Sequence, residues 1–167
     1  MALTANFVLN VNFSFTNPLD LTTPKDVGNL PFSLVLTNGT GDNQADRIWH
    51  DQRTLAHGAN ETLDFHDGTL YDAFGALTLD KLKALVIVNY SVEACLLVGG
   101  AVATVLPLFA DDTDIIKVPF GSALQPGWIA WANPKGLDIS SASDLKLAHD
   151  GTGSASLTFK IIAVGVD

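Results

Sequence analysis

The sequence predicts an all-β fold: an antiparallel β-sandwich of the jelly-roll kind, with at most one short helical turn. Apolar and polar residues alternate over several short segments, turn residues recur between these segments, and no stretch has the 3.6-residue period of a long helix. The chain has 167 residues, the length of one domain, and no linker or internal repeat divides it. We therefore expect a single domain over residues 1–167.

Residues 7–15 give the clearest strand pattern. Every second residue from Phe7 to Phe15 is apolar, and most of the residues between them are Asn or Ser. A period of two with aromatic and β-branched residues predicts a strand with one buried face. We expect Phe13 in the core, where truncation to Ala would cost ~3–5 kcal/mol, and Asn12 at the surface, where truncation would cost little.

Residues 16–31 break this pattern. They contain Pro18, Pro24, Pro31 and Gly28 and have no hydrophobic period. This composition predicts a long loop or arm, and long loops in compact domains are often functional. The segment is interpreted either as a tether over the sheet or as an interaction arm. In the second case Pro18 and Pro24 are candidate interface residues.

The rest of the chain alternates strand and turn signals. Strong turns are expected at residues 38–42 (NGTGD) and 134–136 (PKG), and a short helical turn is expected within residues 72–85. Further strands are predicted over residues 32–37, 47–55, 61–65, 84–90, 94–98, 113–119, 128–133, 144–149 and 155–166.

The charge balance argues against some partners. Nine Lys and Arg against eighteen Asp and Glu give a net charge of −9, so neither nucleic acid nor a membrane is an expected partner. The uncharged run over residues 94–110 is interrupted by Gly99-Gly100 and Pro107, which favours two strands around a turn rather than a membrane span. Cys95 is the only cysteine, which is typical of a reducing compartment.

No motif in the sequence predicts catalysis, a metal site or a cofactor. The histidines lack the H-x-H spacing of metal-binding sandwiches, and the acidic run at 111–114 lacks the glycine and distant Glu of a calcium loop. Neither Ser122 nor Ser154 lies in a G-x-S-x-G elbow. We therefore expect a protein that is not an enzyme. The four histidines are His50, His57, His66 and His149.

Trp128 and Trp131 are three residues apart in the predicted strand 128–133, and so face opposite sides of it. One is expected in the core and the other is potentially exposed. An exposed Trp is a candidate interface residue, either as a protein anchor or as a sugar platform, whereas packing of both in the core is the alternative.

Residues 39–88 contain a series of short strand and turn elements. On the strand 47–55, Trp49, Asp51 and Arg53 share one face, and His50 lies on the other; Asp51 and Arg53 are expected to pair. The elements are Ala45-Asp46, Trp49-His50-Asp51, Arg53-Thr54-Leu55, Glu61-x-Leu63-Asp64, Asp72-Ala73-Phe74-Gly75 and Lys83-Ala84-Leu85. Through these elements the segment resembles small structural proteins of tailed bacteriophages and prophages.

This resemblance implies a virion protein with a β-sandwich fold, in particular a capsid cement or decoration protein on the surface of the phage head. Its implied partners are the major capsid protein and further copies of itself, as a dimer or trimer, assembled in the cytoplasm of the bacterial host. The alternative hypothesis is a receptor- or carbohydrate-binding module of a phage tail, baseplate or fibre.

Overall fold

The computed structural model describes residues 2–18, 20–100, 102–108, 111–122 and 124–167, and over these residues it is built of β-strands without a helix. The strands are β1 Ala5–Thr16, β2 Lys25–Asn38, β3 Gln44–Ala45, β4 Arg47–Leu55, β5 Asn60–Asp64, β6 Tyr71–Asp72, β7 Gly75–Ala76, β8 Lys81–Asn89, β9 Leu96–Gly99, β10 Ile115–Val118, β11 Gly127–Asp138, β12 Asp144–His149 and β13 Leu157–Val166.

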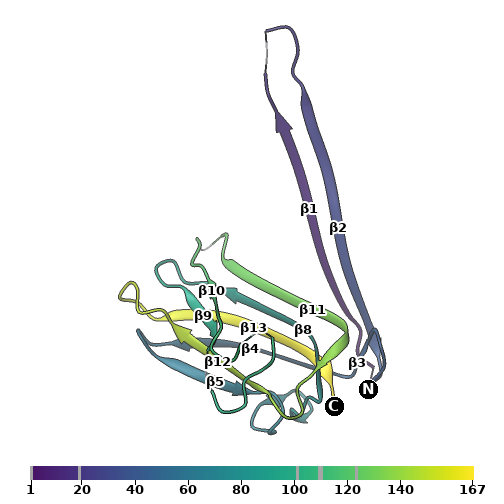
Figure 1. Ribbon diagram of the computed structural model, residues 1–167, viewed down its shortest axis with the longest axis vertical. Coiled ribbons are helices and arrows are strands. Elements are labelled where there is room, and N and C mark those ends of the chain that lie inside the picture. The colour runs from purple at the N-terminus through teal and green to yellow at the C-terminus, as the bar shows by residue number, and fades with distance from the viewer. Residues whose placement is uncertain (1, 19, 101, 109–110, 123) are drawn as a thin grey trace.

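Two four-stranded antiparallel sheets form the body of the molecule (Figure 1). Their strand orders are β10-β9-β12-β5 and β11-β8-β13-β4. The predicted antiparallel sandwich is confirmed, and β4 and β12 have the predicted bounds of 47–55 and 144–149. The body is therefore assembled from strands distant in sequence, because β4 and β8 both pair with the last strand, β13.

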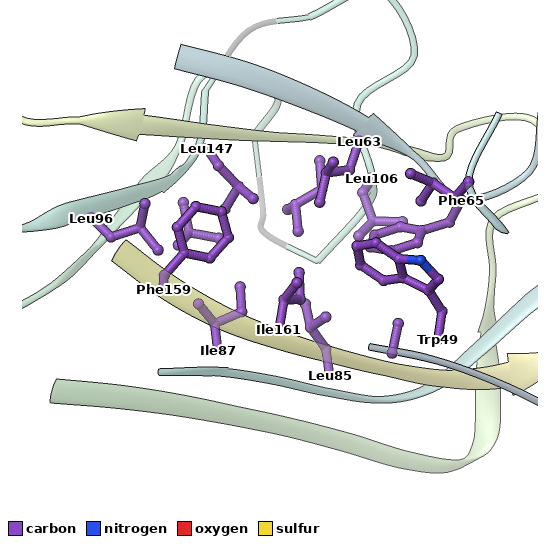
Figure 2. Packing of buried hydrophobic residues seen from close by; sticks show 14 of the residues in the cluster. Trp49, Leu63, Phe65, Leu85, Ile87, Leu96, Leu106, Leu147, Phe159 and Ile161 are labelled. Atoms are coloured by element: carbon purple, nitrogen blue, oxygen red, sulfur yellow. The ribbon is translucent and has the colours of Figure 1, made fainter. Parts of the chain in front are cut away.

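The core lies between the two sheets, as Figure 2 shows. Phe159 from β13 and Phe65, which follows β5, are fully buried. The Trp49 and Phe65 rings meet edge to face, with centroids 5.9 Å apart. Such aromatic pairs are stabilised by ~0.5–1.5 kcal/mol beyond the burial of their area. This layer of side chains packs the two sheets against each other, and the resulting body supports the projecting β1–β2 hairpin.

Three sequence expectations are wrong. Within residues 16–31, a strand (β2) begins at Lys25, and only the residues around Pro18 and Pro24 form a loop. Residues 72–85 hold no helical turn: β6 and β7 form a small hairpin, and β8 begins at Lys81. Residues 102–108 form turns instead of a second strand after Gly99-Gly100, and β9 pairs with the later strand β10.

The β1–β2 hairpin is the most conspicuous feature of the molecule. Its strands pair from Ala5↔Leu36 to Thr16↔Lys25 and project away from the body as a long arm (Figure 1). The strand predicted over residues 7–15 is confirmed, but its burial is not. Phe13 is 51% exposed, because the body covers only the base of the arm. We call this hairpin, Ala5–Asn38, the arm.

We predict that Phe159→Ala lowers the free energy of unfolding by ~3–5 kcal/mol, because it empties a site between the two sheets. The matched control is Phe120→Ala, which removes a ring that is 49% exposed on the body and should cost less than ~1 kcal/mol. Urea unfolding followed by tryptophan fluorescence measures both. Similar losses in the two variants would contradict the placement of the core.

Candidate protein-interaction surface

One face of the arm is apolar from Phe7 to Phe15, with Asp26 beside Phe15 at its outer end. Residues paired across an antiparallel ladder share a face, so Leu9 lies beside Phe32 and Val11 beside Leu30. Exposure on this face rises from 42% at Leu9 to 72% at Phe15. The other face carries mainly Asn and Ser, together with the exposed Val8, Val27 and Val35. We call the first the apolar arm face; it comprises Phe7, Leu9, Val11, Phe13, Phe15, Leu30, Phe32 and Leu34.

Gly28 lets the Phe13 ring lie flat across the neighbouring strand. The two residues are paired, and a Cβ placed on Gly28 would lie 2.1 Å from the Cζ atom of Phe13. Any larger residue at position 28 would therefore displace the ring. The glycine keeps the outer part of the apolar arm face low and continuous.

The base of the arm is anchored on the outer surface of the β11-β8-β13-β4 sheet. Leu36, which is fully buried, packs in a small cluster with Ala5 from β1, Ala84 from β8 and Val164 from β13. The backbone adds hydrogen bonds from Thr37 N to Asn43 O (3.0 Å) and continues into the short parallel β2–β3 pairing. The arm is therefore fixed at its base and free of contact with the body beyond it.

Lys83 links the turn at the base of the arm to β11. It is 1% exposed, and its Nζ donates hydrogen bonds to the backbone carbonyl oxygens of Gly41 (3.1 Å), Pro134 (3.1 Å) and Lys135 (2.8 Å). Gly41 belongs to the turn that leads from the arm into the body, and residues 134 and 135 belong to a bulge in β11. Burial lowers the pKa of Lys83. Sequence reasoning missed this residue.

Gly136 makes room for the lysine. Its φ of +88° is a conformation that favours glycine, and a Cβ there would lie 3.1 Å from Cδ and Cε of Lys83. The bulge and the lysine stem therefore fit only because residue 136 has no side chain.

A groove of about 690 Å³ runs between the apolar arm face and the outer surface of β8 and β11. The arm contributes Phe7, Leu9 and Phe32 to one wall, and the sheet contributes Val86, Trp128 and Ala130 to the other. Both walls are mainly apolar. The groove brings the arm together with the strand that carries both tryptophans singled out in the sequence.

The two tryptophans face opposite sides of β11, as predicted. Trp131 packs against the core from the inner side, whereas Trp128 is 51% exposed on the outer side. Pro18 and Pro24 are exposed at the far end of the arm, beyond the Thr16–Lys25 pair, and the structure does not bring them near the tryptophans. The four candidate interface residues thus fall into two separate places.

The residues of the phage-like segment lie in the body and have structural contacts. Asp51 accepts a hydrogen bond from Nε of Arg53 (2.9 Å), which confirms the predicted pair. Arg53 also bonds Glu61 at 3.2 Å and lies over the Trp49 ring, 5.8 Å from its centroid. His50 is exposed on the outer side of the sheet. These contacts hold the edge strand β4 to β5.

A second polar group lies where β12 ends. The side chain of Asp150 is 4% exposed, and its Oδ2 lies 3.0 Å from Nζ of Lys117 on β10. Burial alone would raise the pKa of Asp150, but hydrogen bonds from Thr152 and the nearby Lys117 ammonium outweigh burial and hold that pKa well below its ordinary value. The ion pair links the β12–β13 turn to β10, the edge strand of the sheet that contains β12.

Two searches of the described part of the chain gave negative results. It holds no group of three or more His, Cys, Asp or Glu placed to bind a metal ion. Nor does it hold a helix with the length and apolarity to cross a bilayer.

Comparison of the chain with protein-family models, with curated proteins and with solved structures gave no match.

We predict that Lys83→Met lowers the free energy of unfolding by ~1–3 kcal/mol, because three carbonyl oxygens each lose a hydrogen bond to a charged donor, although Gly41 O and Pro134 O keep one from a backbone amide. Hydrogen exchange at the Asn43 amide, which donates to Pro134 O, should also accelerate. Lys81→Met, an exposed change on the same strand, serves as the control and should leave both quantities near wild type. Equal effects from the two variants would refute the anchoring role of Lys83.

A second prediction concerns acid stability. The pKa of Asp150 is lower in the folded chain than the ~3.9 of an unfolded Asp, so its stabilisation is complete above that pH and is lost as the pH falls below it. The free energy of unfolding should therefore decline between about pH 5 and pH 2. Asp150→Asn should flatten this decline, whereas Asp20→Asn, near the end of the arm, should not. The check is urea unfolding at stepped pH.

Proposed function

We propose that this protein is a non-enzymatic virion structural protein, a capsid cement or decoration protein that stabilises a phage head by bridging major capsid subunits. The observation that carries the proposal is the arm: a long hairpin that projects from a well-packed body and whose outer apolar face is not covered by its own chain. Exposed apolar patches of this size are typical of protein-interaction sites.

The strand order supports the jelly-roll form of the sandwich. Numbered along the chain from β4, the eight body strands alternate between the two sheets except at β9 and β10, which are neighbours in one sheet. This interleaving is the arrangement of two Greek keys. Jelly rolls include viral capsid and lectin domains, so this fold agrees with the phage-like segment by analogy and leaves the lectin alternative in place.

The distribution of charge supports attachment through the body. The arm strands carry no charged residue except Lys25 and Asp26 beside the tip. Acidic side chains gather instead at the end of the sandwich that holds the C-terminus, where Asp46, Asp72 and Asp167 surround Arg47. A basic patch on the shell is the surface that such an acidic end fits. In this proposal the body meets the shell and the arm links copies.

The alternative, a receptor- or carbohydrate-binding module, is favoured by the exposure of Trp128. A sugar platform needs polar side chains beside the ring to bond hydroxyl groups. The groove around Trp128 is mainly apolar, with Asn6 and Ser33 as polar members of its lining. The groove therefore suits a protein surface better than a glycan.

The decisive experiment is cosedimentation of the purified protein with phage heads assembled without it. We expect saturable binding that weakens as salt rises from about 50 to 500 mM, because attachment through an acidic surface is screened. Decorated heads should also resist heat better than bare heads. Protein that remains in the supernatant but binds host cells or glycans would establish the alternative.

A further inference from the structure

We propose that the apolar arm face is covered by the arm of a second copy, the two arms stacking face to face in opposite directions around a two-fold axis. The tip of each arm then lies in the groove at the base of the other. This inference deepens the proposed function by naming the partner of the arm, and it rests on that function only for its biological setting.

The sequence pattern of the arm is that of a strand with a covered face. In β1 every second side chain from Phe7 to Phe15 is apolar, and β2 presents Leu30, Phe32 and Leu34 on the same face. Within one chain only the base of that face is buried, at Ala5 and Leu36. The outer part thus has the composition of a sheet face that is buried in a core, but no second sheet of the same chain covers it.

The area is sufficient for a specific dimer. Six side chains of the outer apolar arm face are 42–72% exposed: Leu9, Val11, Phe13, Phe15, Leu30 and Phe32. Large apolar side chains that are half uncovered offer together ~500–700 Å² per copy. Two copies would bury ~1,000–1,400 Å², which reaches the range of specific interfaces, ~1,200–2,000 Å². The exposed Trp128 at the groove adds to this area.

The charges favour a second copy over a basic partner. A partner that recognised this protein by its net charge of −9 would approach acidic side chains, and this face has a single one, Asp26 beside Phe15 at its outer end. The cores of protein interfaces are depleted in charge, and a two-fold contact requires a surface that is complementary to itself. The uncharged apolar strip from Phe7 to Phe13 meets both requirements.

Sheet packing and two-fold symmetry together define how the two arms would stack. Packed sheets lie ~10 Å apart, so each arm supplies the missing layer of the other. Val11 is the midpoint of the apolar residues 7–15 of β1, and an antiparallel two-fold arrangement places it opposite its own copy. Phe13 and Phe15 then move toward the other copy's groove, which Val86 and Trp128 line.

The test is sedimentation velocity of the full chain, free of heads, over a range of concentrations. The wild type should sediment as a pair of 17.7-kDa chains. Leu30→Ser should weaken the dimer about tenfold or more, since it places a hydroxyl in the centre of the apolar contact. The matched control, Leu124→Ser, makes the same change at a residue that is 94% exposed on the body and should leave the dimer intact.

A cross-linking experiment tests the stacking itself. Cys95 is buried, so Val11→Cys supplies the single accessible thiol. Packed sheets lie ~10 Å apart, which is too far for a direct disulfide, so a short bis-maleimide reagent should link the two copies. Leu124→Cys should not cross-link. Circular dichroism and urea unfolding establish that each variant keeps the body fold, which is expected because Val11 and Leu30 are 44% and 54% exposed in the single chain.

The outcomes separate this inference from the proposed function. A wild type that stays monomeric, equal weakening by Leu30→Ser and Leu124→Ser, or a dimer in which Val11→Cys does not cross-link would each overturn the stacked arms. A monomer that still binds heads would overturn only this inference. A dimer that does not bind phage heads would overturn only the proposed cement function.

Discussion

The buried ammonium of Lys83 determines where the arm points. It bonds carbonyl oxygens from the turn below the arm and from the bulge of β11, so two segments that are far apart in the sequence share one buried donor. Two of these oxygens also accept backbone hydrogen bonds, Gly41 O from Gln44 N and Pro134 O from Asn43 N, so loss of the ammonium would cost ~1–3 kcal/mol. Because Leu36 packs beside this anchor, the base of the arm belongs to the body and the rest of the arm does not.

A projecting hairpin with an exposed apolar face is unusual in a folded domain. A two-stranded ribbon is marginally stable by itself, and both of its edges are open to pairing with other chains. The arm limits the second hazard with Pro31 on one edge and with a polar face, where Asn29 donates to Asn12 across the ladder (2.6 Å). Stacking of two arms would offset the marginal stability of each ribbon, because the apolar faces of both ribbons would be buried together.

Much of the body could be predicted from the sequence, and the arm could be predicted only in part. Alternation identified β1, β4 and β12, and it placed Trp128 and Trp131 on opposite faces. The same alternation made Phe13 a core residue, because periodicity reports which face is apolar and not what covers it. Residues 25–31 were missed as strand because Gly28 and Pro31 lower strand propensity, although an edge strand tolerates both.

Lys83 was missed for a different reason. A lysine in a predicted strand is interpreted as solvated unless a partner is known. Alternation along β8 does not place it either, because the pairing of β8 with both neighbouring strands skips residue 83 and Leu82 lies in the core. Its partners are backbone carbonyls from residues 41, 134 and 135, and no side-chain motif records them. The bulge that delivers two of these carbonyls also required knowledge of the β11–β8 register.

The separation of charge from apolar surface explains how two acidic copies could join at all. Each chain carries a net charge of −9, and two bodies in direct contact would repel. A strand rises ~3.3 Å per residue, so the twelve residues of β1 span ~40 Å, against a screening length of ~8 Å at physiological salt. Arms stacked in opposite directions would hold the two bodies farther apart than the screening length, so the repulsion between their charges would be weak. The pair would then offer two separated acidic surfaces to a shell, which is the geometry that bridging neighbouring subunits requires.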